Sequence, residues 1–302
     1  MKKLLLLKFD NRQEECHLPD RKGWEVKIDP AGLYGGKDFL NEYHYSVVKS
    51  SKPDFVIVLC RGCCEAEFDE SMKKNLWPKG PKYITWSTDD YRHTDRVELS
   101  DLHLGSIPSS SMADTDNNLI LFGAPFLCPR PVSQRYTEFG IACRKYNGLD
   151  YGWREDHISS IINLGMQINR VSTLWPSVYR EFNRSLMYSL NIPVYRDSSP
   201  NYRHFELGFS GCLSFQPLTD QKTGLDINED WNPEFYPNLI TYNSFDELID
   251  VRERYKYSDD DVKKWNKYFM NNHCLQNRLN HMFKKYYDLD FPLVELKNNI
   301  GW

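Results

Sequence analysis

Apolar and polar positions in the first half of the chain alternate between short hydrophobic runs and longer amphipathic segments. The hydrophobic runs predict β-strands over 3–9, 24–28, 53–59, 83–86 and 118–124. Apolar residues at helical spacing predict helices over 38–50 and 67–75. Strands that alternate with helices are typical of a parallel sheet with crossover helices. We therefore predict a Rossmann-like α/β domain over 1–150.

The segment between the two halves carries weaker signals. A helix is predicted after Pro131 up to Phe139, and 141–146 is interpreted as a strand or a sheet edge. Residues 149–157, with nearby glycines and mixed charge, are the best candidate for an interdomain linker.

The second half repeats the alternation of strands and helices. Strands are predicted over 158–165, 191–195, 212–215 and 239–242. Helices are predicted over 179–185, around 203–207, and over 244–249 and 273–283. This order predicts a second domain over 157–285, followed by a tail over 286–302.

Composition is that of a globular protein with room for two domains in 302 residues. The net charge of −4 argues against a nucleic-acid coat protein or a polybasic membrane anchor. The aromatic content is high, and aromatic rings suit stacking on bases and sugars as well as core packing.

Targeting signals are weak. The N-terminal apolar run ends at Lys8, which is shorter than the roughly 7–15 apolar residues of a signal peptide, so it is interpreted as a first strand. No segment approaches the roughly 20 apolar residues of a membrane helix. The eight cysteines lack the spacing of a disulfide framework or a zinc ribbon. We expect reduced thiols and a cytoplasmic location.

The richest candidate chemistry lies between 191 and 215. Glu206 follows Arg203 by three residues, which places both on one helix face. Helix N-termini attract anions through free N–H groups, so this unit could hold a diphosphate with Arg203 and a ribose diol with Glu206. Further donors to phosphate or sugar oxygens are Ser199, Asn201, Tyr202 and, from the preceding helix, Arg184.

These side chains also have ordinary structural interpretations. The Glu206 carboxylate can simply favour its helix dipole, and Arg184 can form a surface salt bridge. Asp89 and Asp90 directly follow the predicted strand 83–86. Either could act as general base for an acceptor hydroxyl or bind the acceptor, and either could equally be a loop carboxylate that caps a helix or pairs with an arginine.

The second half resembles the C-terminal domain of GT-B glycosyltransferases, in particular the CgeB-like "glycosyl transferases group 1" family. The family segment reads roughly "LN…RxFExxAxGxxLL", and its neighbours read "YxxxxxxSK", "hYxdxeEL" and "HTxxxRxxxIh". The matching pieces are, in chain order, 179–185, 190–192, Arg203, Phe205, Glu206, Gly211, Leu213, 239–242, 244–249, His273, Asn277, Arg278, Met282 and Phe283.

The resemblance implies two Rossmann-like domains that face a cleft, with a compact C-terminal domain. The donor sugar nucleotide, first of all a UDP-sugar, would lie at Arg203 and Glu206, and the acceptor near Asp89 and Asp90. The resemblance leans towards retention of configuration without metal or cofactor, whereas a base at Asp89 or Asp90 would give inversion. It also implies that the tail over 286–302 returns to the N-terminal domain.

The substrate and even the catalytic role remain open on sequence. The acceptor could be a glycan, a protein or DNA, the last as in viral enzymes that glycosylate DNA bases. A non-catalytic protein that binds nucleotide sugars or glycans is the main alternative. The chain lacks the G-x-G-x-x-G, Walker A and G-x-S-x-G motifs in the required context, which disfavours NAD enzymes, P-loop NTPases and α/β-hydrolases. The bare D-x-D matches at 114–116 and 288–290 are discounted as metal sites because such matches are frequent by chance.

Overall fold

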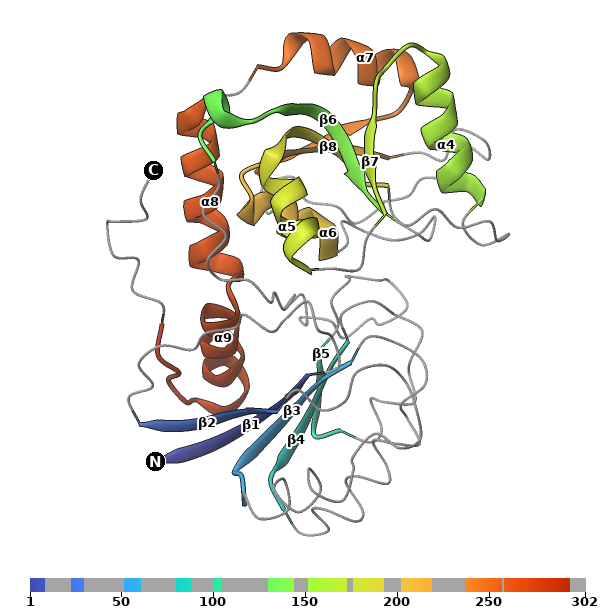
Figure 1. The fold of residues 1–302 in the computed structure, drawn as a ribbon. Coiled ribbons are helices and arrows are strands. Elements are labelled where there is room, and N and C mark those ends of the chain that lie inside the picture. The colour runs from blue at the N-terminus through green and yellow to red at the C-terminus, as the bar shows by residue number, and fades with distance from the viewer. Residues whose placement is uncertain are drawn as a thin grey trace. The chain divides into compact units, whose positions relative to one another are not determined.

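The structure is a computed structural model with two compact α/β units, each built on a parallel five-stranded sheet (Figure 1). It describes residues 1–8, 23–29, 52–60, 80–87, 100–104, 130–143, 152–172, 176–192, 202–218, 237–256 and 258–293. Unit 1 comprises Met1–Pro125 with His273–Glu295, and unit 2 is built on Phe126–Asn272.

The sheet of unit 1 has the strand order β2-β1-β3-β4-β5 with parallel neighbours throughout. Its strands are β1 Lys2–Lys8, β2 Trp24–Asp29, β3 Phe55–Cys60, β4 Lys82–Ser87 and β5 Leu102–Leu104. The first four confirm strands predicted from the sequence. The predicted helices over 38–50 and 67–75 and the predicted strand over 118–124 lie outside the described residues.

An aromatic cluster joins this sheet to the last helix, α9, which spans Leu275–Tyr287. The Trp24 ring lies 4.5 Å from the Phe283 ring and 5.0 Å from the Phe291 ring, centroid to centroid. The Trp24 indole N–H also donates to the Asp290 carbonyl at 2.8 Å. Since these contacts bury large apolar areas, α9 and the residues after it complete the core of unit 1.

The sheet of unit 2 has the order β10-β9-β8-β6-β7, again with parallel neighbours. Its strands are β6 Thr137–Ala142, β7 Asn169–Val171, β8 Leu186–Leu190, β9 Leu213–Pro217 and β10 Leu239–Tyr242. Its helices are α4 Gly152–Asn163, α5 Pro176–Ser185, α6 Tyr202–Phe209, α7 Phe245–Arg254 and α8 Asp259–His273. In both sheets the first strand lies between the second and the third, so the strand order reverses at β1/β3 and at β6/β8.

Helices cover both faces of the second sheet (Figure 1). On one face, Gly140 of β6 admits α5: a Cβ there would lie 2.6 Å from Leu186 Cδ2 and 2.9 Å from Phe182 Cζ. On the other face, His157 of α4 forms a buried hydrogen bond of 2.7 Å with the Tyr242 hydroxyl. The second sheet therefore lies between two helix layers, as in doubly wound folds.

The division of the chain differs in two places from the predicted domains 1–150 and 157–285. Strand β6 pairs with β7 and β8, so the chain enters the second unit before residue 150. Helix α9 packs on the first sheet, so the chain leaves the second unit well before residue 285. Apolar contact with Trp24 and Phe55 determines the place of α9, and sequence order does not reveal such contacts.

Three local predictions were wrong. The predicted strand over 158–165 and the predicted linker over 149–157 fall largely within α4, which buries Trp153, Ile158 and Ile161 at helical spacing. The predicted helix up to Phe139 is a single 3-10 turn followed by β6. Of the predicted strand over 191–195, Asn191 and Ile192 follow the end of β8, and 193–195 lie outside the described residues.

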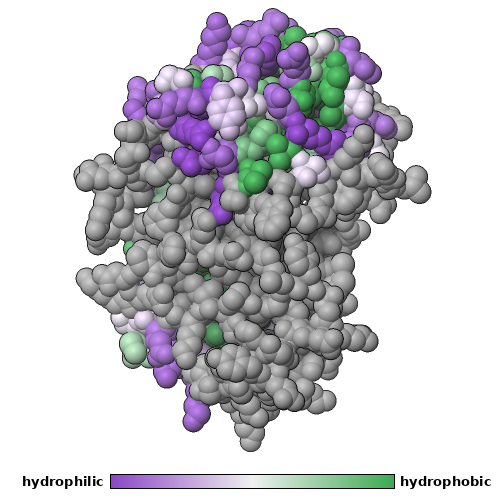
Figure 2. All heavy atoms as spheres, in the orientation of Figure 1, coloured by the Kyte–Doolittle hydropathy of each residue, from purple (hydrophilic) through white to green (hydrophobic). Residues whose placement is uncertain are grey.

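On the face shown in Figure 2, hydrophilic side chains cover most of the described part of unit 2, and hydrophobic ones form small patches. Among the described residues, no helix is both long and apolar enough to cross a bilayer.

Candidate functional site at the junction of β8 and α6

The candidate site lies where β8 ends and α6 follows. Strands β6 and β8 are neighbours at the reversal of the strand order in unit 2. In doubly wound sheets, ligands bind outside the carboxyl ends of the strands at this reversal. Helix α6 follows β8, so its N-terminus belongs to the carboxyl edge where a ligand is expected.

Tight packing fixes the position of α6. Phe205 and Phe209 are buried, and both rings contact the Phe269 ring of α8 at 5.8–5.9 Å between centroids. Gly208 lies directly under that ring: a Cβ there would be 2.2 Å from Phe269 Cε2. The side chain of Asn266 adds a hydrogen bond of 2.8 Å from α8 to the Phe209 carbonyl. The inner face of α6 therefore has no room to shift.

The glycine of the family-like pattern ends α6. Gly211 has a left-handed backbone with φ of 68°. Its N–H donates to the Gly208 carbonyl at 3.0 Å, and the Cys212 N–H donates to the Leu207 carbonyl at 2.8 Å. This is a Schellman ending, and Cys212 and Leu207 also make the apolar contact that accompanies it. Gly211 thus has a structural function that needs no ligand.

The outer part of α6 carries the predicted pair. Arg203 and Glu206 are both half-buried, three residues apart. The Tyr179 hydroxyl of α5 donates a hydrogen bond to Glu206 Oε2. The tyrosine therefore orients the carboxylate.

The histidine between Arg203 and Phe205 is not a cation. His204 is fully buried and its ring contacts the rings of Phe205 and Phe269. Burial lowers its pKa from 6.5 to about 3, so the ring is neutral at physiological pH. The positive charge on this helix therefore comes from Arg203.

Arg184 belongs to a network of ion pairs. Its Nη1 lies 3.5 Å from Glu181 Oε2, one helical turn away on α5. Glu181 also accepts from Arg130. These contacts support the interpretation of Arg184 as part of a salt bridge more directly than its interpretation as a phosphate ligand.

Two buried amides lie at the ends of β8 and β9. Asn191 Nδ2 donates to Gln216 Oε1 at 2.9 Å, and neither residue is exposed. Asn191 Oδ1 has no hydrogen-bond partner among the described residues. A buried carbonyl oxygen without a partner costs free energy, so this oxygen is a candidate acceptor for a group brought by a ligand.

The predicted site residues are therefore described unevenly. Arg203 and Glu206 lie on α6 as expected, Arg184 pairs with Glu181, and Tyr202 begins α6 with its side chain outside the described part. Four predicted residues lie outside the described ranges: Asp89, Asp90, Ser199 and Asn201.

Sequence reasoning missed Tyr179 as a member of the site. The signal was present, because Tyr179 is the first letter of the family-like helix pattern over 179–185. Its contact with Glu206 bridges 27 positions and could not be derived from spacing.

Comparison with known proteins does not identify a family for the chain. No family model matches the chain, and no curated protein matches it significantly. Within the described residues, no group of three His, Cys, Asp or Glu side chains is placed to hold a metal ion.

Proposed function

We propose that the chain is a GT-B-like glycosyltransferase whose donor is a nucleotide-diphosphate sugar, bound without a metal. The observation that carries the proposal is the position of Arg203 and Glu206 on the helix that follows β8, at the reversal of the strand order. A cation, the N–H groups at a helix N-terminus and an oriented carboxylate are the groups that a diphosphate and a ribose diol require.

Each group has a distinct part in donor binding. The first-turn amides of α6 and the Arg203 guanidinium bind the diphosphate. Glu206 accepts hydrogen bonds from the ribose hydroxyls, and the Tyr179 hydroxyl holds its carboxylate in place. Asn191 Oδ1, buried at the end of β8, accepts from a donor group of the nucleotide. A UDP-sugar is the first donor to test.

The reaction transfers the sugar to a hydroxyl group. A bond forms between the acceptor oxygen and the anomeric carbon, and the bond from that carbon to the diphosphate oxygen breaks. The diphosphate leaves with the electron pair, stabilised by Arg203 and the α6 amides. In a retaining reaction the acceptor proton passes to the leaving phosphate; in an inverting one, Asp89 or Asp90 takes it.

A non-catalytic protein that binds nucleotide sugars is the second candidate. The compactness of the C-terminal domain, expected from the resemblance, motivates it. Such a protein would keep the donor contacts on α6 and show no transfer.

The deciding experiment measures release of the nucleotide diphosphate from UDP-, GDP- and ADP-sugars. The acceptor panel contains glycans, a protein mixture and double-stranded DNA. We expect release with one nucleotide family, stimulated by one acceptor class and lost in Glu206→Ala. Asp250→Ala, which removes an exposed carboxylate on α7, is the matched control and should retain activity. Binding without release would support the second candidate, and neither binding nor release would refute both.

A further inference from the structure

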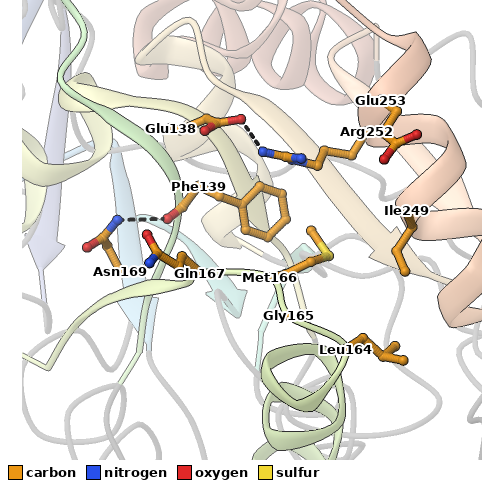
Figure 3. A pocket seen from close by; sticks show the side chains of 10 residues that line it. All are labelled: Glu138, Phe139, Leu164, Gly165, Met166, Gln167, Asn169, Ile249, Arg252 and Glu253. Carbon is orange, nitrogen blue, oxygen red and sulfur yellow. Dashed lines mark hydrogen bonds and ion pairs between the residues drawn. The ribbon is translucent and has the colours of Figure 1, made fainter.

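A pocket of about 340 Å³ lies at the amino edge of the second sheet, at the opposite strand ends from the proposed donor site (Figure 3). It is bordered by the first residues of β6 and β7, by the segment 164–167 that follows α4, and by the last turns of α7. Its volume is at the lower end of the range of small-molecule sites. It therefore has room for a small organic molecule.

The pocket has an apolar side. Phe139, Leu164, Met166 and Ile249 contribute to its wall, and Figure 3 shows the Phe139 ring between Met166 and Arg252. Phe139 is 2% exposed and Leu164 is 47% exposed, so the apolar surface continues from the interior to the rim. An apolar or aromatic body of a ligand would gain free energy by covering it.

The polar side of the pocket presents an excess of negative charge. Arg252 is already paired with Glu138. Glu253 is exposed and has no hydrogen bond or ion pair among the described residues. Asn169 Nδ2 donates to the Phe139 carbonyl at 3.3 Å, which leaves its Oδ1 as an acceptor. Besides this ion pair, the polar side chains of the pocket are thus Glu253 and the amides of Asn169 and Gln167, of which only Glu253 is charged.

The helix dipoles at this edge of the sheet also favour a cation. Helix α4 ends at Asn163 and α7 ends at Arg254, so two helices direct their carbonyl ends towards this edge of the sheet. The C-terminal end of a helix carries partial negative charge and favours cations. A phosphate or a carboxylate is therefore a poor ligand for this pocket.

We propose that the pocket binds a small organic cation that carries an apolar or aromatic body. The body covers Phe139, Met166 and Ile249, and the ammonium group lies against the Glu253 carboxylate. This site is separate from the α6 site, and the proposal does not depend on glycosyl transfer.

The test compares two probes of similar size and opposite charge, 2-phenylethylamine and 3-phenylpropionate, by ligand-observed NMR titration of the full chain at pH 7. We expect the amine to bind about twofold to fivefold more tightly than the acid, because an exposed charge pair contributes up to about fivefold in affinity. The preference should shrink as salt is raised from 20 to 300 mM.

Two variants locate the effect. Glu253→Gln should weaken amine binding by about threefold and reduce its salt dependence, because the charge pair is lost. Asp250→Asn, one turn earlier on α7, should leave amine binding unchanged. Glu206→Ala should also leave it unchanged, which separates this site from the proposed donor site. Equal affinity for the two probes, no binding of either at 10 mM, or an unchanged affinity in Glu253→Gln would overturn the proposal.

Discussion

The carboxyl and amino edges of the second sheet differ in the charge that they can bind. At the carboxyl edge, α6 begins near Arg203 and the half-buried Glu206 is held by Tyr179. At the amino edge, an apolar pocket ends in the exposed carboxylate of Glu253. The first arrangement suits a diphosphate with a diol, and the second suits an amine.

The difference follows from the topology. In a parallel sheet with crossover helices, helix N-termini gather at the carboxyl ends of the strands and helix C-termini at the amino ends. The dipoles therefore favour anions at one edge and cations at the other. Side chains on α6 and α7 add to this polarity, so one fold can present two sites of opposite preference.

The largest effect should come from disturbing α6 without touching its polar face. Gly208→Ala places a Cβ 2.2 Å from Phe269 Cε2, and we expect a loss of about 1–3 kcal/mol in the free energy of unfolding. Urea unfolding measures the loss. Nucleotide binding should fall and amine binding should persist, which would show that the proposed sites at the two edges of the sheet are independent.

Gly152→Ala is the matched control for that substitution. A Cβ at Gly152, the first residue of α4, would have no heavy atom within 4 Å. The variant should therefore be as stable as the parent or slightly more stable. Equal losses at Gly152 and Gly208 would show that the close contact with Phe269 is not the cause.

A smaller effect concerns pH and the buried histidine of α6. Because burial lowers the pKa of His204 to about 3, the unfolded chain binds a proton below about pH 6.5 that the folded chain does not. The free energy of unfolding should thus fall as the pH is lowered from 6.5 towards 3, by about 1 kcal/mol at pH 5.5. Chemical denaturation at pH 7.5 and 5.5 measures this loss, and His204→Phe should reduce it. An unchanged loss in the variant would contradict the assignment.

The smallest effect should come from Tyr179→Phe, which removes only the hydroxyl that donates a hydrogen bond to Glu206. One hydrogen bond contributes about 0.5–1.5 kcal/mol, so donor affinity should fall between about twofold and tenfold. Isothermal titration with the donor nucleotide measures it. A loss as large as that of Glu206→Ala would mean that Tyr179 contacts the ligand itself, and no loss would remove the tyrosine from the site.

Strands with continuous apolar runs could be predicted from the sequence, whereas short mixed segments could not. The run over 53–59 was identified because buried parallel strands are hydrophobic on both faces. The segment over 158–165 was misassigned because a few apolar residues in a short window fit a strand or a helix, and only the burial of Trp153 and Ile161 distinguishes them.

The candidate site divides in the same way. Arg203 and Glu206 could be found from sequence because they lie on one helix and their spacing is local. Tyr179 and the Asn191–Gln216 pair depend on contacts across 27 and 25 positions, which only the packing of α5 on α6 and of β8 on β9 creates. Long-range pairs of this kind leave no periodic signal in a single sequence.

The most direct measurement is a thermal-shift titration of the full chain with UDP, GDP, ADP and CMP, compared between the parent, Glu206→Ala and Asp250→Ala. Ligand at 100 times its dissociation constant stabilises a folded protein by about 2.7 kcal/mol, which is a readable shift. We predict a shift with one nucleotide family that is retained in Asp250→Ala and reduced in Glu206→Ala by a tenfold or greater loss of affinity. An equal shift in all three proteins, or none with any nucleotide, would contradict a donor site on α6.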